Sequence, residues 1–234
     1  MILGNRGLSL FVFTAILISS VSLAEDILSP AELSRARSAM GSEAIALYQK
    51  LATKHPLSAT VWFELGELHY DSKSWQDALT AYQQAAKFGW QPVTIQIRLG
   101  KTYEKLKRYM ESETAFRKAL EGGPASIPAL FGLASALFYQ EKAAAAAPLF
   151  ELLSKRTDEW GFVSREFLAQ LYYDLGRFDE ALVLVTALLE KTPTDMGLQW
   201  LAGRLYFKKK DYEQALPYFK LSLIHISEPT RLRR

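Results

Sequence analysis

The feature that most constrains the fold of this chain is an internal repeat with a period of 34 residues. One column of the repeat pairs Leu or Ala with a following Gly or Ala, at Leu65-Gly66, Leu99-Gly100, Leu133-Ala134, Leu168-Ala169 and Ala202-Gly203. The register shifts only once, by a single inserted residue before Leu168. A unit of this length cannot bury its apolar face alone, so neighbouring units must stack on one another.

Three further columns predict what each unit contains. A small residue recurs at Ala44, Ala78, Ser112, Ala146, Ala181 and Ala215. A large apolar residue follows four positions later, at Tyr48, Tyr82, Phe116, Phe150, Val185 and Phe219, and alternate rows close at Pro56, Pro124 and Pro193. Because each row holds two amphipathic segments around a polar break such as DSKS, KLKR or DLGR, it predicts a helix, a turn and a second helix. We expect the rings of Tyr82, Phe116 and Phe150 to fill the space opposite the small residues.

The joint pattern W-x2-L-G-x2-Y, A-x3-F and P, with Trp62 three residues before Leu65, resembles the tetratricopeptide repeat (TPR) family over residues 25–220. The resemblance implies an all-α fold, a right-handed solenoid of antiparallel helix pairs with about five and a half repeats, truncated at the C-terminus. The predicted segments are a divergent or capping repeat at 25–58, repeats at 59–92, 93–126, 127–161 and 162–195, and a partial repeat at 196–220.

The first row departs from the pattern, and helix signals explain how it still folds. Ser29, Pro30 and Glu32 form a helix start with Ser as the N-cap and Glu three residues later. Pro148 and Pro217 occupy the same column inside the second helix, where each removes one backbone donor and predicts a mild bend.

Residues 1–24 resemble a secretory signal peptide. Arg6 precedes an apolar run from Leu8 to Val21, and small residues at Ser22 and Ala24 precede an acidic pair, which predicts cleavage after Ala24. The alternative is an uncleaved membrane anchor, but the run is shorter than the roughly 20 residues that a spanning helix needs. The absence of Cys excludes a lipoprotein anchor and disulfides. We therefore expect an exported protein, in the bacterial periplasm, with membrane contact only through an uncleaved signal.

The last segment, LSLIHISEPTRLRR at 221–234, resembles the translation of a transposase adapter used in sequencing libraries. On this interpretation the segment is a non-native tail and the repeat array continues beyond the sequence. The tail also carries three of the basic residues behind the formal charge of +3. Without 1–24 and 221–234, acidic and basic residues balance, so nucleic-acid binding loses its compositional support.

No catalytic or metal-binding constellation is present in the sequence. The histidines are His55, His69 and His225, and His69 occupies a column that holds Tyr in other rows, which favours a packing role. Motifs for phosphate-binding loops, dinucleotides, zinc proteases and nucleophile elbows are missing. We expect neither enzymatic activity nor a cofactor nor a metal.

The TPR resemblance implies that the fifth, ninth and twelfth positions of each row line a concave groove. The residues assigned to a peptide-binding groove are Phe63, Glu67, Tyr70, Lys101, Phe131, Phe138, Tyr173, Trp200, Arg204 and Phe207; Ile97, Glu104, Ser135, Glu166 and Gln170 complete these positions. Residues 25–220 contain no Asn, so the Lys, Arg and Asn clamp with which family members grip a terminal carboxylate is absent. Aromatic anchors suit an extended or helical peptide. The alternative is that several rings, Phe131 and Phe138 above all, pack against neighbouring helices.

The predicted function is therefore an exported, non-catalytic scaffold that binds a protein or peptide in its groove. The alternative is the N-terminal interaction arm of a larger enzyme or cell-wall-binding protein whose C-terminal part is missing. Self-association through the apolar face of the last repeat is a further expectation.

Overall fold

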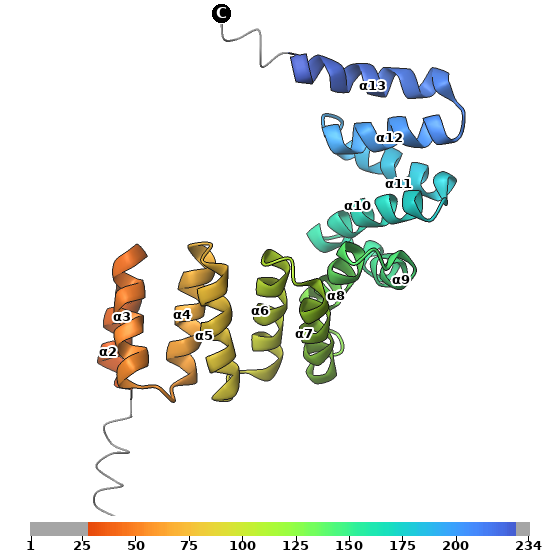
Figure 1. Ribbon diagram of the computed structural model, residues 1–234. Helices are drawn as coiled ribbons and strands as arrows, with labels where there is room; N and C mark the ends of the chain where they lie inside the picture. Colours follow the sequence, from red (N-terminus) through yellow and green to blue (C-terminus); the bar gives the residue numbers. More distant parts are fainter. Residues whose placement is uncertain (1–27, 228–234) are drawn as a thin grey trace, which may run out of the picture. The chain divides into compact units, whose positions relative to one another are not determined.

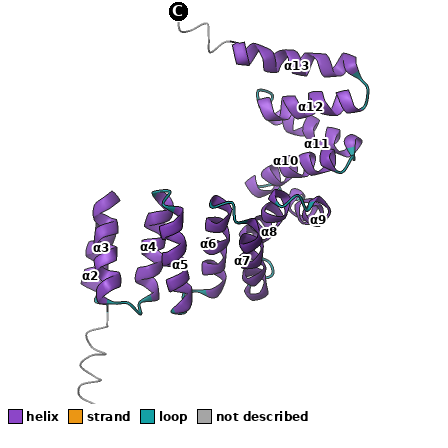
Figure 2. Ribbon diagram, viewed as in Figure 1, coloured by secondary structure: helices purple, strands orange, loops and turns teal. Residues whose placement is uncertain are grey.

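The computed structural model describes residues 28–227, with side chains described for 28–220. This part of the chain is entirely helical (Figures 1 and 2), as the repeat predicts. Its twelve helices are α2 (Pro30–Ser38), α3 (Gly41–Lys54), α4 (Ala59–Asp71), α5 (Trp75–Lys87), α6 (Pro92–Lys105), α7 (Tyr109–Gly122), α8 (Ile127–Tyr139), α9 (Ala143–Ser154), α10 (Glu159–Asp174), α11 (Phe178–Lys191), α12 (Met196–Lys208) and α13 (Tyr212–Ser227). The predicted signal peptide and residues 228–234 lie outside the described residues.

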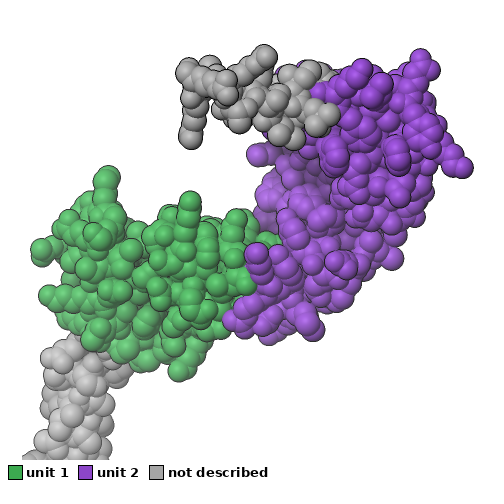
Figure 3. Space-filling model, turned by 45° about the horizontal axis from the view of Figure 1, so that its top comes forward, with its two compact units in different colours: residues 1–106 green, residues 107–234 purple. Residues whose placement is uncertain are grey.

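Helices that follow one another in sequence pack as pairs, such as α4 with α5 and α12 with α13. The chain forms two compact units, residues 1–106 and 107–234 (Figure 3), and each is described by itself. The first unit contains α2 to α6 and the second contains α7 to α13. The division falls at the turn inside the predicted repeat 93–126.

The first helix begins as its sequence predicts. The Glu32 backbone N–H donates to Ser29 Oγ at 3.3 Å, and the Ser29 backbone N–H donates to Glu32 Oε2 at 3.1 Å. This reciprocal capping box satisfies two backbone donors at the start of α2. Lys54 Nζ from the end of α3 donates to the same carboxylate, through Oε1 at 2.5 Å, and thereby joins the two helices.

In the five repeats that follow the first, the turn between the two helices contains one residue in the left-handed region. These residues are Lys73 (φ 62°), Lys107 (59°), Glu141 (60°), Gly176 (74°) and Lys210 (63°). After α4, the Ser74 N–H donates to the His69 carbonyl at 2.9 Å and the Lys73 N–H donates to the Tyr70 carbonyl at 3.0 Å. This Schellman pattern satisfies carbonyls at the helix end, and it requires the positive φ. A non-glycine residue pays a conformational penalty there.

Small residues allow the helices to approach closely, and aromatic rings fill the contacts. A Cβ placed on Gly66 in α4 would lie 2.6 Å from two ring atoms of Tyr82 in α5, and a Cβ on Gly203 in α12 would lie 2.8 Å from Phe219 in α13. The rings of Tyr82, Phe116 and Phe150 are fully buried, as expected from their column. The sequence did not indicate a further close approach, in which Gly132 in α8 lies against the Phe116 ring of α7.

The two prolines do not end their helices. Pro148 lies inside α9 and Pro217 lies inside α13, which extends through Ser227 into the segment predicted to be non-native. Within the described range, no helix combines the length and the apolar character needed to cross a membrane.

Candidate functional site

In the first unit, the predicted groove residues lie on α4 and α6. Phe63 stacks on Trp90, with ring centroids 4.5 Å apart and an interplanar angle of 17°, and lies 5.9 Å from the Tyr82 ring. One turn further along α4, Glu67 accepts a hydrogen bond from the Tyr82 hydroxyl at 2.5 Å. Burial, reinforced by this hydrogen bond, raises the pKa of Tyr82. The phenol therefore stays a donor and fixes the Glu67 carboxylate.

Two cations of α6, Arg98 and Lys101, lie near the carboxylates of Glu67 and Glu104. Arg98 in α6 forms an ion pair with Glu67, with Nη2 and Oε2 2.7 Å apart. Lys101 lies one turn further along α6 and is partly buried. Burial lowers the pKa of Lys101 and repulsion from Arg98 lowers it further, while attraction to Glu104 and Glu67 opposes part of this change. An anionic group from a partner would offset both effects, because it favours the charged form of the amine.

Trp90 supplies an unused donor on this unit. Its indole Nε1 is buried and has no hydrogen-bond partner among the described residues, while its ring stacks on Phe63. A buried donor without an acceptor is unfavourable, so an acceptor from a bound segment would relieve it. Sequence reasoning missed Trp90, although an aromatic residue in the break before Pro92 could have indicated it.

Tyr70, Tyr173 and Phe207 share a different role. Each packs against the first residue of the following helix: Tyr70 on Trp75 with centroids 4.9 Å apart, Tyr173 on Phe178 at 5.7 Å, and Phe207 on Tyr212 at 5.3 Å. These rings brace the turn inside their repeat. Burial raises the pKa of Tyr70, which agrees with partial enclosure.

In the second unit, Phe131 and Phe138 belong to an aromatic cluster around Phe167. Phe131 lies 5.8 Å and Phe138 lies 5.1 Å from the Phe167 ring, both edge-on, and Phe131 also contacts Trp160 at 5.1 Å. Phe167 stacks on the fully buried Phe150 at 5.0 Å. The packing interpretation of Phe131 and Phe138 is therefore the one that the contacts support.

The remaining predicted residues lie on α10 and α12 of the same unit. Arg204 places its guanidinium 4.1 Å from the centre of the Tyr173 ring, a cation–π contact between neighbouring repeats. Trp200 packs edge-on against Phe219 at 5.1 Å but remains 49% exposed, and Phe207 is 55% exposed. The structure thus brings Phe63, Glu67 and Lys101 to one unit, and Trp200, Arg204 and Phe207 to the other.

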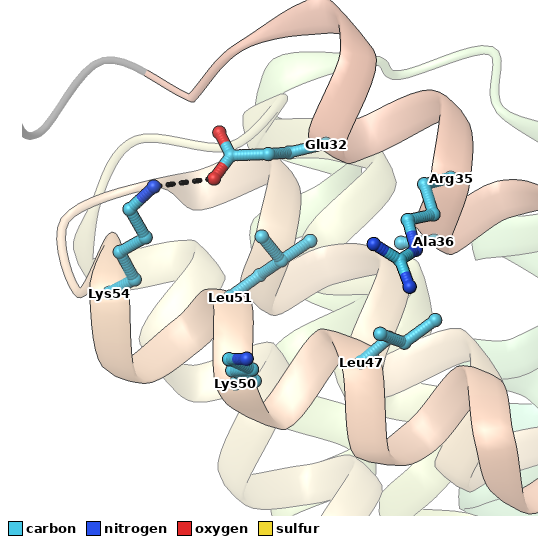
Figure 4. Close-up of a pocket in the computed structure, with 7 residues that line it drawn as sticks. All are labelled: Glu32, Arg35, Ala36, Leu47, Lys50, Leu51 and Lys54. Carbon is cyan, nitrogen blue, oxygen red and sulfur yellow. Dashed lines mark hydrogen bonds and ion pairs between the residues drawn. The ribbon is translucent and has the colours of Figure 1, made fainter.

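A cavity of about 370 Å³ lies between α2 and α3 (Figure 4). Leu51 occupies its centre, with the Glu32–Lys54 ion pair on one side and Arg35 and Leu47 on the other. Part of its polar lining, the Glu32 carboxylate, already takes part in the capping contacts of α2. We therefore explain this cavity by the packing of α2 on α3.

His55 and His69 are buried, which agrees with the packing role expected for His69, and His225 has no described side chain. Across the described residues, no three His, Cys, Asp or Glu side chains are grouped so that they could hold a metal ion.

The comparisons with known proteins agree with the helical repeats described above. The profile of a family described as "Tetratricopeptide repeat" matches residues 41–91, 97–158 and 168–227, which together exceed half of the chain. The curated proteins yield no match. Among solved structures, YrrB, described as "a TPR protein with an unusual peptide-binding site", is 21% identical with a TM-score of 0.63, over 75% of this chain and 90% of YrrB.

Two other solved structures have similar folds. A MamA protein is 20% identical with a TM-score of 0.63, over 75% of this chain and 96% of that one. The APC/C hetero-tetramer Cut9-Hcn1 contains a chain that is 19% identical with a TM-score of 0.61, covering 78% of this chain and 36% of the other. At these identities the likeness establishes the fold alone.

Proposed function

Because this chain belongs to the tetratricopeptide repeat family, whose members are typically non-catalytic scaffolds, we propose that it is an exported scaffold that binds a segment of a partner protein. The proposed site is the α4–α6 surface, which we define as Phe63, Glu67, Trp90, Arg98 and Lys101. The peptide-binding site named for YrrB supports a peptide as the occupant.

The observation that carries this proposal is the environment of Lys101. Its side chain is partly buried near Arg98, Glu67 is already engaged by Arg98 and Tyr82, and Glu104 and Glu67 together offset the effect of burial only in part, because the pKa of Lys101 remains lowered. A positive charge held in this way destabilises the unbound protein. A ligand that brings a hydrogen-bond acceptor or a carboxylate to Lys101 should therefore bind favourably. The stacked Phe63 and Trp90 rings supply the apolar contact area that a peptide anchor needs.

Lys101→Met tests this site because binding and folding should respond in opposite directions. The substitution removes an unfavourably placed charge, so folding should be unaffected or improved, whereas capture of the partner should fall at least about tenfold. The assay is affinity capture from an envelope extract of the source cells with quantitative mass spectrometry. Lys118→Met, which removes an exposed lysine of α7, is the matched control. A protein captured equally by wild type and Lys101→Met would refute the assignment of the site.

Export is tested separately from binding. The arrangement of Arg6, the apolar run and Ala24 supports cleavage and release, and a bacterial periplasm is the proposed location. A fusion of the chain to a reporter enzyme that is active only outside the cytoplasm should show activity and an N-terminus at Glu25. An uncleaved, inactive fusion would contradict export while leaving the binding proposal intact.

A further inference from the structure

The α4–α6 surface offers an apolar contact and a charged contact at two separate places. The apolar contact is the stack of Phe63 on Trp90, with ring centroids 4.5 Å apart, and both rings are only partly buried. The charged contact is Lys101, which is also partly buried. The separation between the two places decides which segments of a partner can occupy both at once. The inference below rests on the proposed function and specifies the occupant of the same site.

A single stripe of side chains along α6 connects the two places. Thr94, Ile97 and Lys101 follow one another at intervals of three and four residues, which puts their side chains on one face of the helix. Trp90 lies in the turn just before α6, at the start of this stripe. All three helical side chains are partly buried, so the stripe is a continuous surface with an apolar residue, Ile97, in its middle.

Two estimates of the separation agree. Lys101 is the tenth residue of α6, which places it about 14 Å along the axis from the start of the helix. Phe63 shares its column of the repeat with Ile97, so Lys101 lies one turn further along, roughly 5 Å, and one interhelical spacing, roughly 9 Å, to the side. This second path amounts to about 10 Å. The stack and Lys101 are therefore about 10 to 14 Å apart.

Arg98, one turn before Lys101, is oriented for contact with the backbone of a bound segment. Its Nη2 lies 2.7 Å from Glu67 Oε2, and the Tyr82 hydroxyl fixes the same carboxylate through Oε1 at 2.5 Å. One carboxylate cannot occupy all five N–H donors of a guanidinium, and the Arg98 side chain is 34% exposed. The remaining donors suit an extended segment, because the carbonyls of a helical segment already accept hydrogen bonds within the helix.

An extended backbone restricts the spacing of the side chains that can contact both places. Successive side chains of such a segment alternate between its two sides, so only residues an even number of positions apart face the same surface. At about 3.3 Å per residue, spacings of two, four and six residues span about 7, 13 and 20 Å. A spacing of four is the even spacing that matches the separation of the stack from Lys101.

We propose that the α4–α6 surface selects an extended segment in which a large apolar side chain and an acidic side chain are four residues apart. The apolar side chain packs on the rings of Phe63 and Trp90, and the acidic side chain pairs with Lys101. The N–H groups of Arg98 hold the backbone between them. Glu104 lies one turn beyond Lys101, and its negative charge disfavours an acidic side chain placed further along the stripe.

The experiment measures the affinity of the full chain for fluorescent peptides by anisotropy. Each peptide carries one phenylalanine and one glutamate among serines and glycines, and the glutamate stands two, three, four or six positions after or before the phenylalanine. Because the composition is constant, differences report the spacing. We expect a spacing of four, in one chain direction, to bind at least about tenfold more tightly than the other spacings. In that peptide, glutamine for glutamate and alanine for phenylalanine should each weaken binding at least about tenfold.

A variant of the protein then assigns the acidic contact. Lys101→Met should abolish the preference for glutamate over glutamine, whereas the control Lys118→Met should retain it, and circular dichroism checks that both variants fold. Affinity that does not depend on spacing, equal binding of the glutamine peptide, or no binding of any peptide would overturn the inference. Capture from the envelope extract that still depends on Lys101 would then retain the proposed function and reject only the spacing; capture that does not depend on Lys101 would reject both.

Discussion

Substituting Gly66 by Ala tests whether close helix approach within a repeat limits what the sequence can accept. A Cβ at position 66 would lie 2.6 Å from Cδ1 and Cε1 of Tyr82, where ordinary contacts begin near 3.4 Å. The ring has little freedom to retreat, because it is fully buried and its hydroxyl donates to Glu67. The added methyl group must therefore displace a ring that is held at both ends.

The change in the free energy of unfolding that Gly66→Ala should cause is the sum of two opposing effects. Alanine is favoured over glycine inside a helix by about 1 kcal/mol. Overpacking a core position destabilises by about 1 to 3 kcal/mol, and the fixed ring places Gly66 near the upper end. We expect the free energy of unfolding to fall by about 2 kcal/mol. With a urea dependence of about 2 kcal/mol/M, the unfolding midpoint should fall by about 1 M.

The assay is urea unfolding followed by far-UV circular dichroism, with tryptophan fluorescence as a second probe. In a Tyr82→Leu background the penalty should shrink by more than about 1 kcal/mol, since the ring that causes it is gone. A Gly66→Ala variant that is more stable than wild type would refute the reasoning, because helix propensity alone would then decide the outcome.

Four further substitutions give expectations of known sign. Lys73→Gly relieves a left-handed conformation and should raise the free energy of unfolding by about 0.5 to 1 kcal/mol, and Gly176→Ala should lower it similarly, both measured by urea unfolding. The hydrogen bond from Lys54, followed by those from Ser29, lowers the pKa of Glu32 to about 2; its stabilising contribution is complete above its ordinary pKa of 4.5 and is lost as the pH falls towards 2. Glu32→Gln should remove this part of the acid dependence of thermal unfolding. Because burial and Arg98 lower the pKa of Lys101, its charged form destabilises the fold; Lys101→Met should be more stable at neutral pH, by an amount that shrinks as the pH approaches 10.5.

The helices could be predicted from the sequence because side-chain periodicity reports which face of each segment is buried. The columns containing Gly66 and Tyr82 identified contacting positions correctly, and the polar breaks located the turns. Gly132 was missed because its contact with Phe116 joins two consecutive repeats, and the column pattern describes positions within one repeat.

The candidate site was predictable only in part. The groove columns named Lys101 and Glu67 but could not distinguish an accessible ring from a packed one. Phe138 contacts Phe167 because of the spacing between α8 and α10, which no single-repeat pattern contains.

The central claim, that the α4–α6 surface binds a partner protein, is tested most directly by photo-crosslinking in the source cells. Benzoylphenylalanine replaces Ile97, which lies one turn from Lys101 on α6, or Thr80, an exposed residue of α5. The account predicts a discrete protein cross-linked from position 97, absent from position 80 and lost when Lys101→Met is added. A cross-link that forms equally from both positions, or from position 80 alone, would contradict it.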